Sequence, residues 1–483
     1  MEETQTNRRK IYSLDHLKPE VVAVAFAKCS RSPESFEDIA NELTDDKSAD
    51  FHEKWVVGYG HSSVAEHANL HMAIENVSIL ATKILEDNRL ASYTEKSTRY
   101  QIYDRTKYYK PAKIMESPLG TEYEKTINYL FDTYVAMEPV MREYIISKYP
   151  MEAGISERAF TATTKARVCD NIRYLLPTST LTNLGMTVNA RALEHAIAKL
   201  LSHPLDEFKE IGEELKTEAM KITPTLIKFA NENKYIQDTD GLFASLSNIM
   251  VPDEPETSSP VEIIDYDHDA ENKLVGALLY KHSELPFRQL IDKVKLLDAK
   301  QKEKIIEESM ARRASYDQPL RELEHIYYTF DILMDYGAFR DVQRHRMCTQ
   351  TNQKVTVKHG YSMPEEIAEA GLQDEFIKAM DASAELYYKM KPQFPHEAQY
   401  VVPLAYKKRT LFTWNLRELH HFISLRSGPK GHISYRRIAQ ECWRKLNDIQ
   451  PLMAKFIRVN MEGGSSSWAS TMFNPEYNFE PKK

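Results

Sequence analysis

Arg344, His345 and Arg346 are consecutive side chains that carry, or can carry, positive charge, and this chemistry suits the binding of an anion. Such groups repel one another, so holding them together is costly unless an anion lies among them. A basic triplet can also be a solvated helix end, which is its commoner meaning in isolation. The anion-site hypothesis therefore needs support from the elements that position these residues.

The residues ahead of this triplet predict a strand and then a short helix. Apolar and polar side chains alternate from residue 326 to residue 332, which is the period of a half-buried strand. Gly337 then opens a helical run that includes Phe339 and Val342. These elements would form a scaffold that directs the basic side chains towards one point.

A second copy of this arrangement occurs earlier in the chain. Apolar and polar residues alternate from 69 to 75, and a helical pattern follows them. Asp87, Asn88 and Arg89 then stand where the later copy has Arg344–Arg346. The repetition of strand, helix and polar triplet indicates that one unit occurs twice.

The match between the copies continues downstream, where Pro177 and Asn189 correspond to Pro403 and Asn415. A unit of roughly 200–240 residues is a whole domain and not a short solenoid repeat. The sequence therefore predicts an α+β fold made by tandem duplication of a mixed α/β domain, with many helices and a small antiparallel sheet in each half. The predicted parts are an N-terminal domain at 1–250, an acidic, proline-rich linker at 251–262 and a C-terminal domain at 263–483.

The composition adds limits on location and partners. The 483 residues carry a net charge of −8, which makes nucleic acid an unlikely general partner and confines phosphate binding to a local site. The four cysteines have no CxxC spacing, so they suit a reducing compartment and predict no disulfide frame. The sequence shows no signal-peptide pattern and no run of eighteen apolar residues. We therefore expect a cytoplasmic protein that has no membrane segment.

Metal and cysteine chemistry are both poorly supported. His61, His67 and His71 could be read as metal ligands at helical spacing. The alternating pattern instead predicts a strand, on which His67 and His71 would lie about 13–14 Å apart, too far to share one ion. Cys348 has no evident catalytic partner. We expect neither a metal nor a cysteine nucleophile.

A second possible anion site lies in the first half. Glu95, Ser97 and Arg99 alternate along the chain, so their side chains would share one side of an extended backbone. A short hydroxyl and a planar guanidinium together suit a phosphate group. The sequence contains neither GxGxxG nor GxxxxGK[ST], which argues against a Rossmann or P-loop nucleotide site.

Taken together, these motifs resemble the flavin-dependent thymidylate synthases, whose signature is RHRxxSxxExSxRY. The resemblance extends over both halves, and it is the combination of motifs that is specific. In the second half it rests on Arg344, His345, Arg346, Asn415, Arg417 and Arg426. In the first half it rests on Glu95, Ser97, Arg99, Tyr100, Arg173 ahead of Pro177, Asn189 and Arg191.

The resemblance implies an enzyme that methylates dUMP to dTMP reductively. Methylenetetrahydrofolate would give the one-carbon unit, reduced FAD the hydride, and NADPH would recharge the flavin, without an enzyme nucleophile. The residues implied to hold the flavin are His325, Arg344, His345, Arg346, Asn415, Arg417 and His421. Those implied to bind the nucleotide are Glu95, Ser97, Arg99, Arg173, Arg344 and Arg426, with catalytic roles for Arg344 and Arg426, the latter polarising the uracil ring.

The two halves depart from the family pattern in complementary ways. The first has Asp87-Asn88-Arg89 in place of the basic triplet and Leu200 in place of the uracil-polarising arginine. The second lacks the nucleotide-binding set, with Asn352, Lys354, Thr356 and Gln399 at those positions. One half keeps the nucleotide-binding residues and the other keeps the flavin-binding residues. We therefore expect working sites that are composed of both halves. The resemblance also implies sites shared between subunits, so we expect a homodimer that forms a pseudotetramer and joins halves from different chains.

Two other functions remain open at this point. The chain could be an inactive paralogue that binds nucleotide or flavin and keeps the basic triplet only to hold an anion. It could also methylate another uracil-containing substrate, including RNA, for which Lys407, Lys408 and Arg409 are a small basic patch. The acidic balance of the chain argues against RNA.

Overall fold

The structure, a computed structural model, describes residues 10–30, 32–43, 62–251 and 259–462. It contains two compact units that interleave the two sequence copies. Unit 1 comprises Met1–Val77, Ile84–Lys96 and Thr182–Pro252, and unit 2 comprises Ser78–Lys83, Ser97–Leu181 and Asp253–Lys483. Unit 2 thus combines the second copy with a large helical part of the first. Most of the linker proposed at 251–262 lies outside the described residues, and the division into domains stays a prediction.

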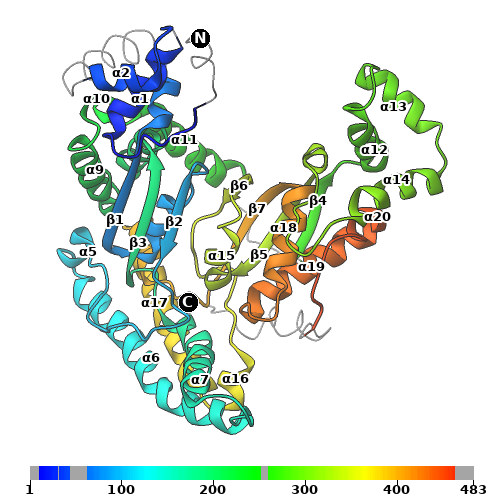
Figure 1. Cartoon of the computed structure of the whole chain (residues 1–483). Helices are drawn as coiled ribbons and strands as arrows, with labels where there is room; N and C mark the ends of the chain where they lie inside the picture. The colour runs from blue at the N-terminus through cyan, green and yellow to red at the C-terminus, as the bar shows by residue number, and fades with distance from the viewer. Residues whose placement is uncertain (1–9, 31, 44–61, 252–258, 463–483) are drawn as a thin grey trace. The chain divides into compact units, whose positions relative to one another are not determined.

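Unit 1 is built on a three-stranded sheet of order β1-β3-β2, in which β2 and β3 run antiparallel (Figure 1). Its strands are β1 (Asn69–Ser78), β2 (Ala91–Glu95) and β3 (Leu181–Asn189). Leu70, Met72 and Ile74 are buried and alternate with exposed residues, which confirms the predicted strand. The helices are α1 (Pro19–Cys29), α2 (Phe36–Glu42), η2 (Ser62–His67), α8 (Ala190–Leu201), α9 (Asp206–Met220), α10 (Pro224–Ile227) and α11 (Lys234–Met250).

Unit 2 contains a four-stranded antiparallel sheet of order β4-β5-β7-β6. Its strands are β4 (Val261–Tyr266), β5 (Tyr327–Asp335), β6 (Cys348–Asn352) and β7 (Lys407–Asn415). Tyr328, Phe330 and Ile332 are fully buried on β5, as the alternation predicts. The fold is therefore α+β, with helices around two small sheets.

The helices of unit 2 come from both copies. Those of the first copy are α4 (Ile79–Leu85), α5 (Ala112–Met115), α6 (Gly120–Lys148), α7 (Glu157–Ile172) and η3 (Arg173–Leu175). Those of the second are α12 (Ala270–Tyr280), α13 (Phe287–Lys295), α14 (Ala299–Ala311), η4 (Arg321–His325), α15 (Tyr336–Val342), α16 (Glu365–Glu369), α17 (Gln373–Met390), η5 (Glu397–Val401), α18 (Leu416–Arg426), α19 (Ile433–Ile449) and α20 (Pro451–Ala454). None of the helices within the described ranges is long and apolar enough to cross a membrane.

Equivalent segments of the two copies pair with each other inside unit 2. The amide of Thr178 donates to the carbonyl of Val402 at 3.0 Å, and the amide of Leu404 donates to the carbonyl of Leu176 at 2.9 Å. Since Pro177 corresponds to Pro403, these two hydrogen bonds are related by a local two-fold arrangement. Helix α6 of the first copy also packs against α17 of the second (Figure 1). The duplicated segments therefore share one core.

Two local expectations were wrong. The sequence pattern at 413–425 predicts a helix, but residues 413–415 belong to β7 and the helix begins at Leu416. The β-branched Thr413 and aromatic Trp414 suit a strand, and the Asn415 side chain caps the helix that follows. The sequence of residues 92–100 is turn-like, whereas residues 92–95 belong to the strand β2.

Candidate active site

The basic triplet lies in a turn between α15 and β6. Asp335 caps the start of α15, since its Oδ1 accepts a hydrogen bond from the amide of Ala338 at 2.7 Å. The turn after α15 is closed by the side chain of Gln350, which donates from Nε2 to the carbonyl of His345 at 2.9 Å. Residues of the two flanking strands thus fix the start of α15 and the turn that contains the triplet.

His345 is buried and is held as a neutral ring. Its Nδ1 lies 3.0 Å from Oε1 of Glu418, and its Nε2 lies 2.9 Å from Nε of Arg426. Because a guanidinium N–H can only donate, Nε2 must carry a lone pair, and the ring proton must therefore be on Nδ1. Burial, together with the charge of Arg426, holds the pKa of His345 well below its usual value. This residue acts as a support for Arg426.

Asp341 lies between two arginines of the second copy. Its Oδ1 is 3.5 Å from Nη1 of Arg426 and 3.8 Å from Nη1 of Arg344. The Arg426 side chain is 12% exposed, whereas that of Arg344 is 46% exposed. One carboxylate therefore pairs with two cations, so the cluster of Asp341, Arg344 and Arg426 keeps a net positive charge. An anion that binds nearby can interact with this charge.

Arg99 of the first copy reaches the same region of unit 2. It donates from Nε and Nη2 to the two carboxylate oxygens of Asp170, at 2.7 and 2.8 Å. Its Nη1 donates to the hydroxyl of Tyr435 on α19 at 3.2 Å. The guanidinium of Arg426 lies 5.3 Å from the centroid of the same tyrosine ring. Arg99 and Arg426, which come from different copies, thus meet at Tyr435 within one chain.

Arg173 is a buried cation at the start of η3, with 2% of its surface exposed. Its Nε and Nη2 have no hydrogen-bond partner among the described residues. A side chain on Gly337 would approach Nη2 of Arg173 to 3.4 Å, so the glycine leaves room for the guanidinium. Burial raises the pKa of the nearby Asp335, although Arg173 and a hydrogen bond from Ser434 oppose the rise. Such buried donors are costly unless a ligand or a rearrangement satisfies them.

The Glu95, Ser97 and Arg99 series does not follow one extended backbone. Glu95 ends β2 in unit 1, whereas Ser97 and Arg99 belong to unit 2. The hydroxyl of Ser97 accepts a hydrogen bond from the amide of Arg99 at 3.1 Å, which stabilises a turn. The serine therefore shapes the backbone that presents the Arg99 side chain.

Several residues of the expected flavin set have structural partners in the second copy. Asn415 caps α18 by accepting from the amide of Glu418 at 2.8 Å. Arg417 pairs with Glu324 at 2.8 Å, and His325 ends the short helix that contains Glu324. His421 is exposed, with its ring centroid 5.2 Å from that of His345, and Arg346 is partly exposed.

The first copy repeats part of this arrangement inside unit 1. Asn189 caps α8 by accepting from the amide of Ala192 at 2.8 Å. Arg191 forms an ion pair with Glu66, as Arg417 does with Glu324. The position of the uracil-polarising arginine is instead taken by Leu200, which is buried. The cap and ion pair persist in both copies, so they serve the fold whether or not a ligand binds.

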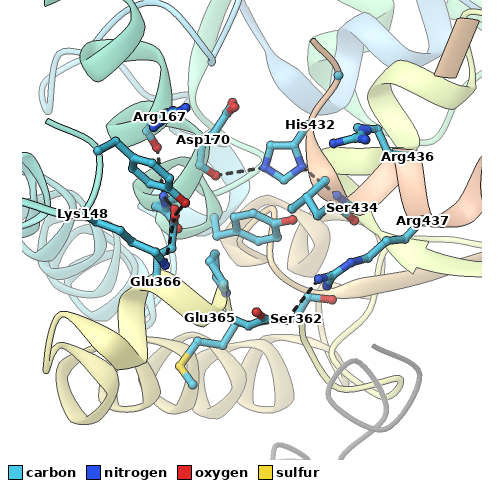
Figure 2. Close-up of a pocket in the computed structure, with 17 residues that line it drawn as sticks. Lys148, Arg167, Asp170, Ser362, Glu365, Glu366, His432, Ser434, Arg436 and Arg437 are labelled. Atoms are coloured by element: carbon cyan, nitrogen blue, oxygen red, sulfur yellow. Dashed lines mark hydrogen bonds and ion pairs between the residues drawn. The ribbon is translucent and has the colours of Figure 1, made fainter. Parts of the chain in front are cut away.

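A cavity of about 390 Å³ in unit 2 has Asp170 among its lining residues (Figure 2). His432 lies opposite Asp170, with its Nε2 3.1 Å from the Asp170 carbonyl oxygen (Figure 2). The cations that line the cavity are Lys148, Arg167, Arg436 and Arg437, and the acids are Asp170, Glu365 and Glu366. None of these cavity residues was identified from the sequence as part of a site. Tyr435 was missed as well. None of them lies in a recognisable sequence motif.

Metal ligands do not gather in the described part of the chain. No group of three or more His, Cys, Asp or Glu side chains within it could hold an ion. His67 ends η2 and His71 lies on β1, while His61, the third histidine considered, is outside the described residues. Cys348 is buried and donates from Sγ to the carbonyl of His345 at 2.9 Å.

Comparison with known proteins assigns the chain to a family. The family model described as thymidylate synthase complementing protein matches residues 14–225 and again residues 262–452, once in each half. A UPF0159 protein of Chlamydia pneumoniae is 34% identical over 93% of this chain and 91% of its own length. A UPF0159 protein of Thermoplasma acidophilum is 30% identical over 85% of this chain and 89% of its own length.

More distant relatives correspond to one half of the chain at a time. A flavin-dependent thymidylate synthase of Clostridium tetani is 28% identical over 214 residues, which are 44% of this chain and 82% of that protein. Matching twice along its length, this chain belongs to the thymidylate synthase complementing protein family, whose relatives include the flavin-dependent thymidylate synthases.

Proposed function

We propose that the chain is a flavin-dependent thymidylate synthase whose sites each combine residues of both copies. The reaction is the reductive methylation of dUMP to dTMP with methylenetetrahydrofolate, FAD and NADPH. The observation that carries the proposal is the meeting of Arg99 and Arg426 at Tyr435, because it joins a nucleotide-binding residue of the first copy to the proposed uracil-polarising arginine of the second. We further propose that the protein is cytoplasmic and acts as a homodimer, a pseudotetramer of four domains.

Arg99, Ser97 and Arg173 are proposed to bind the phosphate of dUMP. Arg99 already holds a carboxylate through two parallel hydrogen bonds, and a phosphate offers oxygens in a matching geometry. The buried Arg173 has donors that a dianion would satisfy. Glu95, which the family resemblance adds to the nucleotide set, ends β2 in unit 1.

Arg344, Arg346 and His345 are proposed to form the flavin side, with His325, Asn415, Arg417 and His421 around them. The donor set fits the pyrophosphate of a dinucleotide, since Arg344 is half exposed and its ion pair with Asp341 is long at 3.8 Å. Bound FAD would supply the hydride. The chain itself binds and orients the reactants, and neutral His345 holds the cation of Arg426, which polarises the uracil ring.

A binding protein without catalytic activity is the second candidate. It is favoured by the pairing of Arg99 with Asp170 and of Arg426 with Asp341, because both cations already have a carboxylate partner. Methylation of RNA is less well supported. Lys407 and Lys408 are only 4% and 7% exposed on β7, so this basic stretch offers little surface to a polyanion.

The test is an assay of purified protein with dUMP, methylenetetrahydrofolate, FAD and NADPH. We expect dTMP to form, and we expect Arg99→Ala and Arg344→Ala each to abolish its formation. Thr356→Ala is the matched control for Arg99→Ala, because Thr356 occupies the position in the second copy that Arg99 occupies in the first. Bound flavin and nucleotide without dTMP would favour the binding protein, and absence of both ligands would contradict the proposal.

A further inference from the structure

We propose that Asp170 is a placeholder for the nucleotide phosphate on Arg99, and that its displacement sets the affinity of the site for nucleotides. The inference rests on the proposed function, since it takes Arg99 as a phosphate-binding residue. Nε and Nη2 of Arg99 each donate to one carboxylate oxygen, at 2.7 and 2.8 Å. A phosphate would use the same two donors, so both groups cannot occupy them together.

The position of Asp170 is unfavourable for a carboxylate that has only a structural role. It lies in the last turn of α7, where the negative end of the helix dipole disfavours an anion. No basic residue of α7 itself lies in that turn. Arg99 provides the side-chain hydrogen bonds to the carboxylate, and Arg173 adds a favourable charge. Asp170 therefore depends on cations that the nucleotide would also use.

Asp170 stands beside a cavity and is partly accessible to solvent. It is one of the residues that line the cavity of about 390 Å³, together with Arg167 and Arg437, and its carbonyl oxygen faces His432 (Figure 2). Because the side chains of Arg99 and Asp170 are 16% and 21% exposed, the pair is reachable from solvent. A carboxylate released from Arg99 can therefore be hydrated by water in place of the guanidinium.

The placeholder has a direct consequence for affinity. In the nucleotide-free protein, the carboxylate neutralises Arg99 and keeps its guanidinium directed towards the site. Binding of dUMP must break this pair, whereas binding of deoxyuridine, which lacks a phosphate, need not. Removing the charge of Asp170 should therefore strengthen binding of the nucleotide and leave binding of the nucleoside unchanged.

The experiment measures binding of dUMP and deoxyuridine to the full chain by isothermal titration calorimetry. We expect Asp170→Asn to bind dUMP about tenfold more tightly than the unaltered protein, which corresponds to the loss of one competing charge-assisted hydrogen bond. Asp331→Asn is the matched control, because Asp331 pairs with Arg409 at 3.0 Å with similar exposure, 22% and 15%, on the sheet of unit 2. Its dUMP affinity should not change.

The outcomes separate this inference from the proposed function. If dUMP binds and Arg99→Ala weakens it, while Asp170→Asn binds dUMP equally or more weakly, then Asp170 orients Arg99 and the placeholder role is wrong. If neither the unaltered protein nor Asp170→Asn binds dUMP, the proposed nucleotide site fails and the inference fails with it. Asp170→Ser, which also removes the charge, should tighten dUMP binding in the same direction, and thermal unfolding checks that each variant is folded.

Discussion

Arg426 donates a hydrogen bond from its Nε to Nε2 of His345, at 2.9 Å. This contact fixes which nitrogen of the imidazole carries the proton, because the guanidinium cannot accept one. The histidine in turn fixes the direction of the arginine that is proposed to polarise uracil. His345, the central residue of the basic triplet, thus acts by positioning Arg426 and does not itself carry a charge.

His345 should stay neutral throughout the physiological pH range. Burial and the charge of Arg426 lower its pKa, so the ring should show no protonation between pH 6 and 8 in nuclear magnetic resonance of its ring nitrogens. Arg426→Gln removes one cause, and the pKa of His345 should rise towards its usual value of 6.5. Protonated His345 at pH 6 in the unaltered protein would contradict the assigned hydrogen bond.

His432 should make the free energy of unfolding depend on pH. Burial, with the charge of Arg173, lowers the pKa of His432 to about 3. Below pH 6.5 the histidine binds a proton in the unfolded state but stays unprotonated in the folded state. The free energy of unfolding therefore falls as pH falls from 6.5 towards 3, by about 1.4 kcal/mol per pH unit. His432→Asn keeps an oxygen that can cap α19 but does not titrate.

The measurement compares denaturant unfolding of the unaltered protein and His432→Asn at several pH values. Between pH 6 and pH 4, the free energy of unfolding of the unaltered protein should fall relative to that of His432→Asn by about 1.4 kcal/mol per pH unit. The protein that contains the histidine is therefore the less stable of the two at low pH. Parallel curves over this range would show that His432 titrates equally in both states. Using the difference removes the contributions of other groups that titrate in the same range.

How much could be predicted from the sequence varies along the chain. Alternation at 69–75 and 326–332 was sufficient for β1 and β5, because one buried face imposes a period of two. The helix α18 begins three residues later than the pattern at 413–425 predicts, because Thr413 and Trp414 belong to β7 and Asn415 caps the helix. The partners of Arg99 could not be predicted, since Asp170 and Tyr435 are 71 and 336 residues away in the sequence. No local pattern records such contacts.

The phosphate of dUMP should be bound by residues of the first copy. Arg99→Ala and Arg173→Ala should each weaken dUMP binding by about 1.5–3 kcal/mol, the range for a hydrogen bond to a charged group, while bound FAD remains. Calorimetry with dUMP and absorbance of the flavin provide the two readings. The controls are Thr356→Ala and Gln399→Ala, at the corresponding positions of the second copy, which should have almost no effect. Equal losses from both pairs would assign a nucleotide site to each copy.

Mixing variants should not restore activity. Because Arg99 and Arg426 meet inside unit 2 of one chain, a site needs both copies of the same chain, in contrast to the exchange between chains that the family resemblance suggests. Co-expressed Arg99→Ala and Arg344→Ala chains should therefore form no active site, as measured by dTMP formation. If sites instead join two chains, half of the randomly paired dimers would each have one intact site, and roughly a quarter of the activity would return.

The number of flavins per chain tests the composite site most directly. If only the second copy offers the basic triplet, and Asp87-Asn88-Arg89 of the first does not replace it, each chain should hold one FAD. The flavin is released by denaturation, and its absorbance is compared with the protein concentration, with Arg344→Ala as the variant that should lose it. A ratio near one supports one composite site per chain, and a ratio near two would contradict it.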